Sequence, residues 1–268
     1  HNGKETVKIV MIGKYFETGD FILSDSYLSV IEAIKYSSYT QNRKPVLTWL
    51  NSSDFEKPAS TRQGGNPARL KDLKKYDGII IPGGFGSRGV EGNLNAVKFA
   101  RENKIPYLGL CYGMQMMVIE YARNVLGLKD ANTREVNPNS KNLVIDVMES
   151  QKEILKNNSY GGSMRLGEYK AILRDKTIAR EAYEKKEITE RHRHRYEVNP
   201  AFIGELEAKG LVFSGRSPDG HLMEIAELPK NKHPFFLGTQ FHPEFLARPL
   251  VPHPLFTAFI KACIKKKK

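Results

Sequence analysis

The sequence predicts an α/β protein with a mainly parallel central sheet flanked by helices, and with an antiparallel, strand-rich appendage in its C-terminal half. In the N-terminal half, short apolar runs typical of buried strands alternate with longer segments of helical periodicity. In the C-terminal half, strand-like runs follow one another more closely than helical ones. Alternation of strands and helices favours parallel pairing with helices on both faces of the sheet.

Each element follows from its local pattern. Apolar runs predict N-terminal strands at 7–12, 45–50, 77–81 and 105–110. The capping signal Ser24-Asp25-Ser26 predicts a helix over the following apolar positions, and further helices are expected at 91–103 and from Met114 to Tyr121. In the C-terminal half we expect strands at 142–148, 166–173, 192–198, 211–217, 221–228 and 235–240, and helices at 177–186, 200–209 and 254–265. Gly- and Pro-bearing stretches predict loops at 51–69 and 149–167.

Composition narrows the class of protein. The chain has 268 residues, 40% of them hydrophobic and 27% charged, which is typical of a globular protein, and we expect one domain over residues 1–268. The net charge of +12 raises the question of nucleic acid, but the basic residues are scattered and no nucleic-acid-binding motif is found, so we expect none. No apolar run reaches the roughly 18 residues that a membrane span needs. Two cysteines are too few for a disulfide framework, so we expect a reducing, cytoplasmic location.

A cysteine stands where a predicted strand meets a predicted helix. In Gly109-Leu110-Cys111-Tyr112-Gly113, a glycine lies two residues to either side of it. This pattern is typical of a nucleophile elbow, in which a sharp turn exposes the side chain and the helix N-terminus favours a thiolate. Taken alone it is equally consistent with a buried structural cysteine beside packing glycines.

A candidate base lies far downstream, directly after a predicted strand. In an extended His242-Pro243-Glu244 segment the two side chains share a face, so that Glu244 can orient the imidazole of His242. A surface turn is the alternative for this tripeptide alone, and the combination with Cys111 favours a catalytic triad.

A third element is the glycine-rich turn Pro82-Gly83-Gly84-Phe85 at the end of a predicted strand. Backbone N–H groups of Gly84 and Tyr112 are suited to an oxyanion hole. A phosphate cradle and a plain loop are the alternatives, and the spacing fits neither of the nucleotide-binding glycine motifs.

With these three elements in the same order, the chain resembles the class I glutamine amidotransferases. Three further segments are similar to the glutaminase domains of the CTP synthase family, namely those beginning at Asp25, Gly161 and Glu190. The resemblance implies Cys111 as nucleophile, His242 as general base and Glu244 as its orienter. It also implies that L-glutamine is held by Gly84, Phe85, Gln115, Glu135 and Arg195. A carboxylate suits the α-amino group of glutamine and a guanidinium suits its α-carboxylate. The neighbouring Arg191 and Arg193 are equally consistent with a solvated strand.

The same resemblance carries expectations about partners. It implies that ammonia from glutamine passes to an N-terminal synthetase domain absent from this sequence, where UTP is aminated to CTP with ATP and Mg²⁺, and that GTP regulates the reaction. We expect no cofactor and no metal in this domain, a tetramer for the full-length enzyme, and a monomer for the isolated domain. Arg165, in a glycine-rich segment, is expected in a regulatory loop facing the synthetase domain or the nucleotide.

The chain also departs from that family in two places. The stretch from Tyr15 to Ser24 is longer than the usual link, and Tyr112 replaces a leucine. Two other classes stay open: a Cys–His hydrolase of γ-glutamyl peptides, and a non-catalytic binding module. The first has no reason to carry the segments at Gly161 and Glu190, and the second would have lost a triad member.

Overall fold

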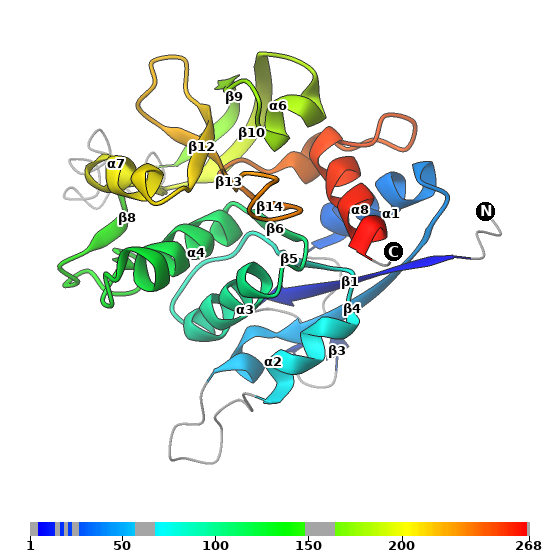
Figure 1. Cartoon of the computed structure of the whole chain (residues 1–268), viewed down its shortest axis with the longest axis horizontal. Coiled ribbons are helices and arrows are strands. Elements are labelled where there is room, and N and C mark those ends of the chain that lie inside the picture. The colour runs from blue at the N-terminus through cyan, green and yellow to red at the C-terminus, as the bar shows by residue number, and fades with distance from the viewer. Residues whose placement is uncertain are drawn as a thin grey trace.

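The central feature of the computed structural model is a nine-stranded sheet with the order β10-β9-β12-β13-β14-β6-β5-β1-β4 (Figure 1). The structure describes residues 5–13, 17–18, 21–22, 27–56, 68–147 and 164–266. The parallel half of the sheet consists of β14 (Phe236–Thr239), β6 (Tyr107–Leu110), β5 (Gly78–Ile81), β1 (Thr6–Gly13) and β4 (Lys44–Asn51). The antiparallel half consists of β13 (Met223–Leu228), β12 (Val212–Arg216), β9 (Arg165–Leu173) and β10 (Glu187–His194). The predicted fold class is confirmed, and the antiparallel strands extend the parallel sheet.

Helices cover both faces of the parallel half, as alternation along β1 requires. Ile9 and Met11 belong to the core cluster formed with α1 (Leu28–Thr40) and α8 (Pro254–Lys266). Val10 and Ile12 belong to the cluster formed with α3 (Val90–Glu102) and α4 (Tyr112–Tyr121). Figure 1 shows α1 and α8 close together, away from α3 and α4. Both faces are therefore buried, and the carboxyl ends of the strands remain for the site.

A small second sheet lies beside the main one, with the order β11-β8-β7. Its strands are β7 (Asn132–Thr133), β8 (Leu143–Val147) and β11 (Tyr196–Val198). A two-stranded pair consists of β2 (Glu17–Thr18) and β3 (Phe21–Ile22). The remaining helical elements are η2 (Ser52–Phe55), α2 (Ala68–Asp72), η3 (Leu73–Lys75), η4 (Ala122–Leu126), α6 (Ile178–Tyr183), α7 (Pro200–Ala208) and η6 (Pro243–Leu246). Among the described helices, none is both long and apolar enough to span a membrane.

The predicted strand 192–198 is wrong as a single element, and the difference matters for the site. Strand β10 ends at His194 and pairs with β9, whereas β11 begins at Tyr196 and pairs with β8. The chain therefore crosses from the large sheet to the small one at Arg195. The strict alternation of exposed and buried side chains along β10 ends at this point, because Arg195 and Tyr196 are both half-buried and Glu197 and Val198 are both buried.

Other differences are smaller. The helix predicted at 177–186 ends earlier, because Glu184 adopts a left-handed conformation with φ of 58°. The predicted loop 51–69 contains η2 and the start of α2, and the predicted loop 149–167 overlaps the start of β9. The capping signal at 24–26, the glycines at 161–162, and most of the long link from Tyr15 lie outside the described residues.

Candidate active site

Cys111 occupies the turn between β6 and α4. Its backbone has φ of 50° and ψ of −96°, which is an unusual conformation for a residue with a side chain. The turn is held by the Cys111 amide, which donates to the carbonyl of Thr239 on β14 over 2.6 Å. A strained residue fixed in this way at the end of a strand is typical of a nucleophile.

The flanking glycines are required by close backbone approaches. A Cβ atom on Gly113 would lie 2.2 Å from the carbonyl oxygen of Ile81, and one on Gly109 would lie 2.6 Å from the carbonyl carbon of Gly113. These distances are too short for any side chain. The elbow therefore depends on glycine on both sides of Cys111, which the sequence pattern indicated.

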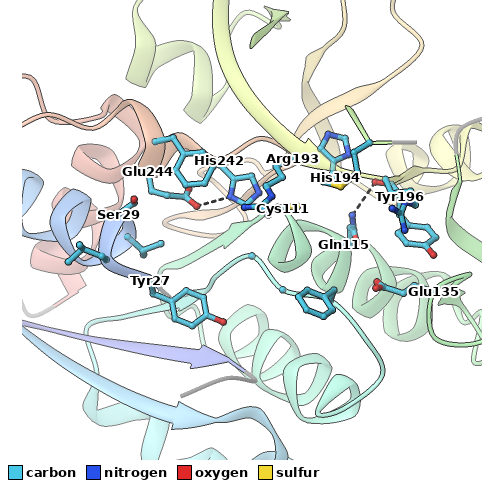
Figure 2. Close-up of a pocket in the computed structure, with 18 residues that line it drawn as sticks. Tyr27, Ser29, Cys111, Gln115, Glu135, Arg193, His194, Tyr196, His242 and Glu244 are labelled. Carbon is cyan, nitrogen blue, oxygen red and sulfur yellow. Dashed lines mark hydrogen bonds and ion pairs between the residues drawn. The ribbon is translucent and has the colours of Figure 1, made fainter. Parts of the chain in front are cut away.

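His242 lies between Glu244 and Cys111 (Figure 2). Its Nδ1 is 2.7 Å from Oε1 of Glu244, and both side chains are buried. Burial by itself lowers the pKa of His242, but the negative charges of Glu244 and Cys111 outweigh it and raise that pKa well above the usual value. The structure therefore brings together the three residues of the predicted triad.

Two residues next to the triad lie close to its side chains. A Cβ on Gly83 would lie 2.8 Å from Cε1 of His242, so glycine here allows the turn after β5 to approach the imidazole. Gln240 donates from Nε2 to Sγ of Cys111 over 3.7 Å, and sequence reasoning missed it. Its place two residues before His242, at the end of β14, was the signal that could have found it.

The Pro82–Phe85 turn and the elbow meet as predicted. A Cβ on Gly84 would lie 3.8 Å from Cδ1 of Tyr112, which places the two predicted oxyanion donors on neighbouring segments. The ring of Tyr112 is only 2% exposed and belongs to the core cluster with α3 and α4. Its replacement of leucine is therefore accommodated inside the domain.

A pocket of about 780 Å³ opens over the triad. The lining includes all three triad residues, Gly84 and the other predicted substrate-binding residues, which are Phe85, Gln115, Glu135 and Arg195. It also includes residues that sequence reasoning did not assign, among them Tyr27, Leu28, Ser29, Met164, Arg193, His194 and Tyr196. Figure 2 shows Glu135 on the opposite side of the opening from Glu244. The pocket thus combines a nucleophile with separated acidic and basic side chains.

The predicted binding residues are fixed by backbone contacts. Oε1 of Glu135 accepts from the amide of Gly86 over 3.0 Å, which ties it to the turn after β5. Gln115 donates from Nε2 to the carbonyl of Tyr196 over 3.1 Å, which ties α4 to the start of β11. These contacts fix Glu135 to the turn after β5 and Gln115 to the start of β11.

Arg165 is a correction to the predicted site. It begins β9, is 5% exposed, and its Nη1 lies 2.7 Å from Oε1 of Glu224. Arg165 is therefore buried at the start of a strand and does not lie in the predicted exposed loop, and its expected regulatory role stays a prediction. The neighbouring glycines indicated a loop, but the strand begins directly after them. Arg193, in contrast, lines the pocket although the solvated alternative was left open for it.

Metal ions in proteins are commonly held by groups of His, Cys, Asp or Glu side chains. Within the described ranges, no group of three or more His, Cys, Asp or Glu side chains is arranged to hold a metal ion.

An elbow cysteine, a His–Glu pair and a glycine turn on a mainly parallel sheet define a class of hydrolytic enzyme, and the chain belongs to the family "Glutamine amidotransferase class-I", whose pattern matches residues 22–262. Within this enzyme family it is similar to the glutaminase domains of CTP synthases. It is 50% identical over 259 residues to the CTP synthase of Sulfolobus acidocaldarius, covering 97% of this chain and 45% of that protein. It is 47% identical over 268 residues to that of Mycobacterium marinum, covering 100% of this chain and 44% of that protein.

Solved structures agree with this placement. The glutaminase domain of Trypanosoma brucei CTP synthase with bound acivicin superposes with a TM-score of 0.85 at 35% identity, covering 97% of this chain and 94% of that one. A GMP synthase subunit from Thermoplasma acidophilum, described as putative, shares the fold with a TM-score of 0.57 at 13% identity, covering 98% and 96% of the two chains. The chain spans less than half the length of the CTP synthases it matches.

Proposed function

We propose that this chain hydrolyses L-glutamine to glutamate and ammonia through a γ-glutamyl thioester on Cys111. The observation that carries the proposal is the Cys111–His242–Glu244 arrangement at the floor of a pocket with acidic and basic sides. The Cys111 thiolate attacks the side-chain amide carbon of glutamine, and the negative charge that develops on oxygen is stabilised by the N–H groups of Gly84 and Tyr112.

His242 then moves the protons of both steps. Its raised pKa keeps the imidazolium available to protonate the amide nitrogen, which leaves as ammonia when the C–N bond breaks, and Glu244 stabilises the charged imidazolium. The neutral imidazole then takes a proton from water, which attacks the thioester and releases glutamate with the thiolate restored. Glu135 pairs with the substrate α-ammonium group, and Arg195 pairs with its α-carboxylate.

The role in a larger enzyme is part of the same proposal. Its support is the similarity to CTP synthases more than twice as long. We propose that the ammonia aminates UTP to CTP on a synthetase domain that supplies the sites for ATP and Mg²⁺, that GTP regulates hydrolysis, and that the full-length enzyme is a tetramer.

Mechanism-based labelling tests the glutaminase step. A glutamine analogue with an electrophilic γ-carbon, such as 6-diazo-5-oxo-norleucine, should add once per chain, at Cys111. The other cysteine, Cys263, is fully buried and lies outside the pocket, so it is the internal control. Intact-mass and peptide mapping check the site. Full labelling of Cys111→Ala, or labelling of Cys263, would contradict the assignment, and faster turnover of a γ-glutamyl peptide than of glutamine would favour the peptide hydrolase.

A further inference from the structure

A cluster of buried ionisable side chains borders the pocket, with His194 in the lining, and takes no part in the steps above. It comprises Arg165 of β9, His192 and His194 of β10, Glu197 of β11 and Glu224 of β13, all at most 5% exposed. Burial of so many charged or polar groups is costly unless they are arranged against one another. The contacts among these five side chains must therefore offset the cost of their burial.

The contacts run in a line across the cluster. Nη1 of Arg165 lies 2.7 Å from Oε1 of Glu224, and Nε2 of His192 lies 3.6 Å from the other oxygen of Glu224. Nδ1 of His192 is 3.0 Å from Nε2 of His194, and Nδ1 of His194 is 3.4 Å from Oε1 of Glu197. These contacts thus join β9, β10 and β13 of the large sheet to β11 of the small sheet.

The same stretch of chain supplies residues to this line of contacts and to the pocket lining. Residues of a strand alternate in direction, so that on β10 Arg193 is exposed and lines the pocket, whereas His192 is buried in the cluster. His194 belongs to both, since it is buried in the cluster and also lines the pocket next to Arg195. Between β10 and β11 the chain changes sheets, and ladder hydrogen bonds do not continue through that point. Arg193 is paired with Leu166 of β9, whereas Arg195 stands between the last residue of β10 and the first of β11, so the cluster lies where the chain passes from one sheet to the other.

Charge makes the two carboxyl groups unequal. Burial, followed by the positive charge of Arg165, lowers the pKa of His192 to about 2 and that of His194 to about 3, so both imidazoles are neutral. Arg165 is then the cation of the cluster, and it lies closer to Glu224 than to Glu197, where the separation is 3.6 Å. Burial, and then the charge of Glu224, raises the pKa of Glu197 well above its usual value. Burial also raises the pKa of Glu224, to about 7. The shorter distance to Arg165 assigns Glu224 as the anionic partner of that guanidinium, and the charge of Glu224 in turn favours the neutral acid at Glu197.

We propose that the line from Arg165 and Glu224 through the two histidines to Glu197 is a positioning unit that fixes the β10–β11 corner, and thereby Arg193 and Arg195, for substrate binding. The proposal rests on the glutaminase function proposed above. It assigns to Glu224 a role in substrate affinity at a distance from the reacting atoms, because loss of its charge leaves Arg165 buried without its closest anion.

Isosteric variants test the asymmetry. Glu224→Gln should raise the KM for glutamine about 10-fold or more while kcat changes less than about 3-fold, whereas Glu197→Gln, which replaces a neutral acid by a neutral amide, should change KM less than about 3-fold. The matched control is Glu227→Gln on the same strand, because Glu227 accepts from the amides of Ile178 and Ala179, outside the pocket lining. It should lower the melting temperature with KM unchanged.

Further measurements separate the outcomes. Alkylation of Cys111 by iodoacetamide, which has no amino-acid head group, should proceed at the same rate in Glu224→Gln and in the unchanged chain. If Glu224→Gln does not fold, His192→Asn replaces it, since asparagine retains a polar atom facing His194 and cannot reach Glu224; the same rise in KM is expected. Normal glutamine turnover with an unchanged KM in the folded variant, or equal effects of the two Glu→Gln changes, would overturn this proposal alone. Absence of glutamine turnover by the unchanged chain would instead contradict the proposed function.

Discussion

The two halves of the large sheet build the site by different means. The parallel half positions Cys111 and His242 with apolar strands, a strained backbone turn and glycines at which backbone segments touch. The antiparallel half positions the basic side of the pocket with buried ionisable groups on β9, β10 and β13. The turn that carries Cys111 is thus shaped mainly by steric contacts, and the basic side of the pocket mainly by buried ion pairs, so that the two halves should respond differently to substitution.

The largest expected effect is on kcat, from removing the negative charge of Glu244 beside His242. Glu244→Gln removes the anion that raises the pKa of His242, and kcat should fall on the order of 10³-fold. Steady-state release of glutamate checks this. Glu190→Gln is a matched control, because Glu190 also accepts a histidine contact, from His253 at 2.9 Å, but lies outside the pocket lining. A kcat close to that of the unchanged chain in Glu244→Gln would remove Glu244 from the triad.

The same variant should also show a pH dependence of stability. A histidine whose folded-state pKa is raised stabilises the fold fully below its unfolded value, about pH 6.5, and loses this contribution as the pH rises through the folded-state pKa. The difference in the free energy of unfolding between the unchanged chain and Glu244→Gln should therefore shrink as the pH rises above 6.5. Urea titrations at a series of pH values measure it, and a difference that grows over this range would contradict the assignment of the raised pKa to Glu244.

Substitution of the basic side should affect binding more than chemistry. Arg195→Ala removes a charge-assisted contact typically contributing about 1.5–3 kcal/mol, so kcat/KM for glutamine should fall about 10- to 150-fold, mainly through KM. Arg191→Ala is the control, because Arg191 is exposed, lies four residues earlier, on β10, and does not line the pocket. Unchanged kinetics of Arg195→Ala at subsaturating glutamine would exclude it from substrate binding.

The smallest expected effect is on the free energy of unfolding and tests the close backbone contacts around the Cys111 turn. Gly113→Ala should lower the free energy of unfolding by about 1–3 kcal/mol, because its Cβ would collide with the backbone of Ile81. Gly204→Ala, in α7 where a Cβ meets no atom within 4 Å, should raise it by about 0.5–1 kcal/mol. Chemical denaturation of both variants measures the contrast. Equal shifts in the two would show that the elbow tolerates a side chain.

How far the sequence predicted the molecule also differs between the halves. Apolar runs and the glycine spacing around Cys111 are local signals, so the parallel strands, the elbow and the approach of His242 could be predicted before the structure. The partner change at Arg195 and the burial of Arg165 depend on which strands pair, and pairing is a long-range property that no local pattern contains. Gln240 was missed for a related reason, since its contact with Cys111 arises from the neighbouring positions of β6 and β14.

The backbone amide of His242 donates to the carbonyl of Arg191 over 2.8 Å, and Arg191 lies on the strand that presents Arg193. A main-chain link of this kind transmits displacement regardless of side-chain identity. A displacement of β10 would therefore shift the basic lining of the pocket and the backbone of His242 together, so that the two sides of the proposed active site are mechanically coupled through one hydrogen bond.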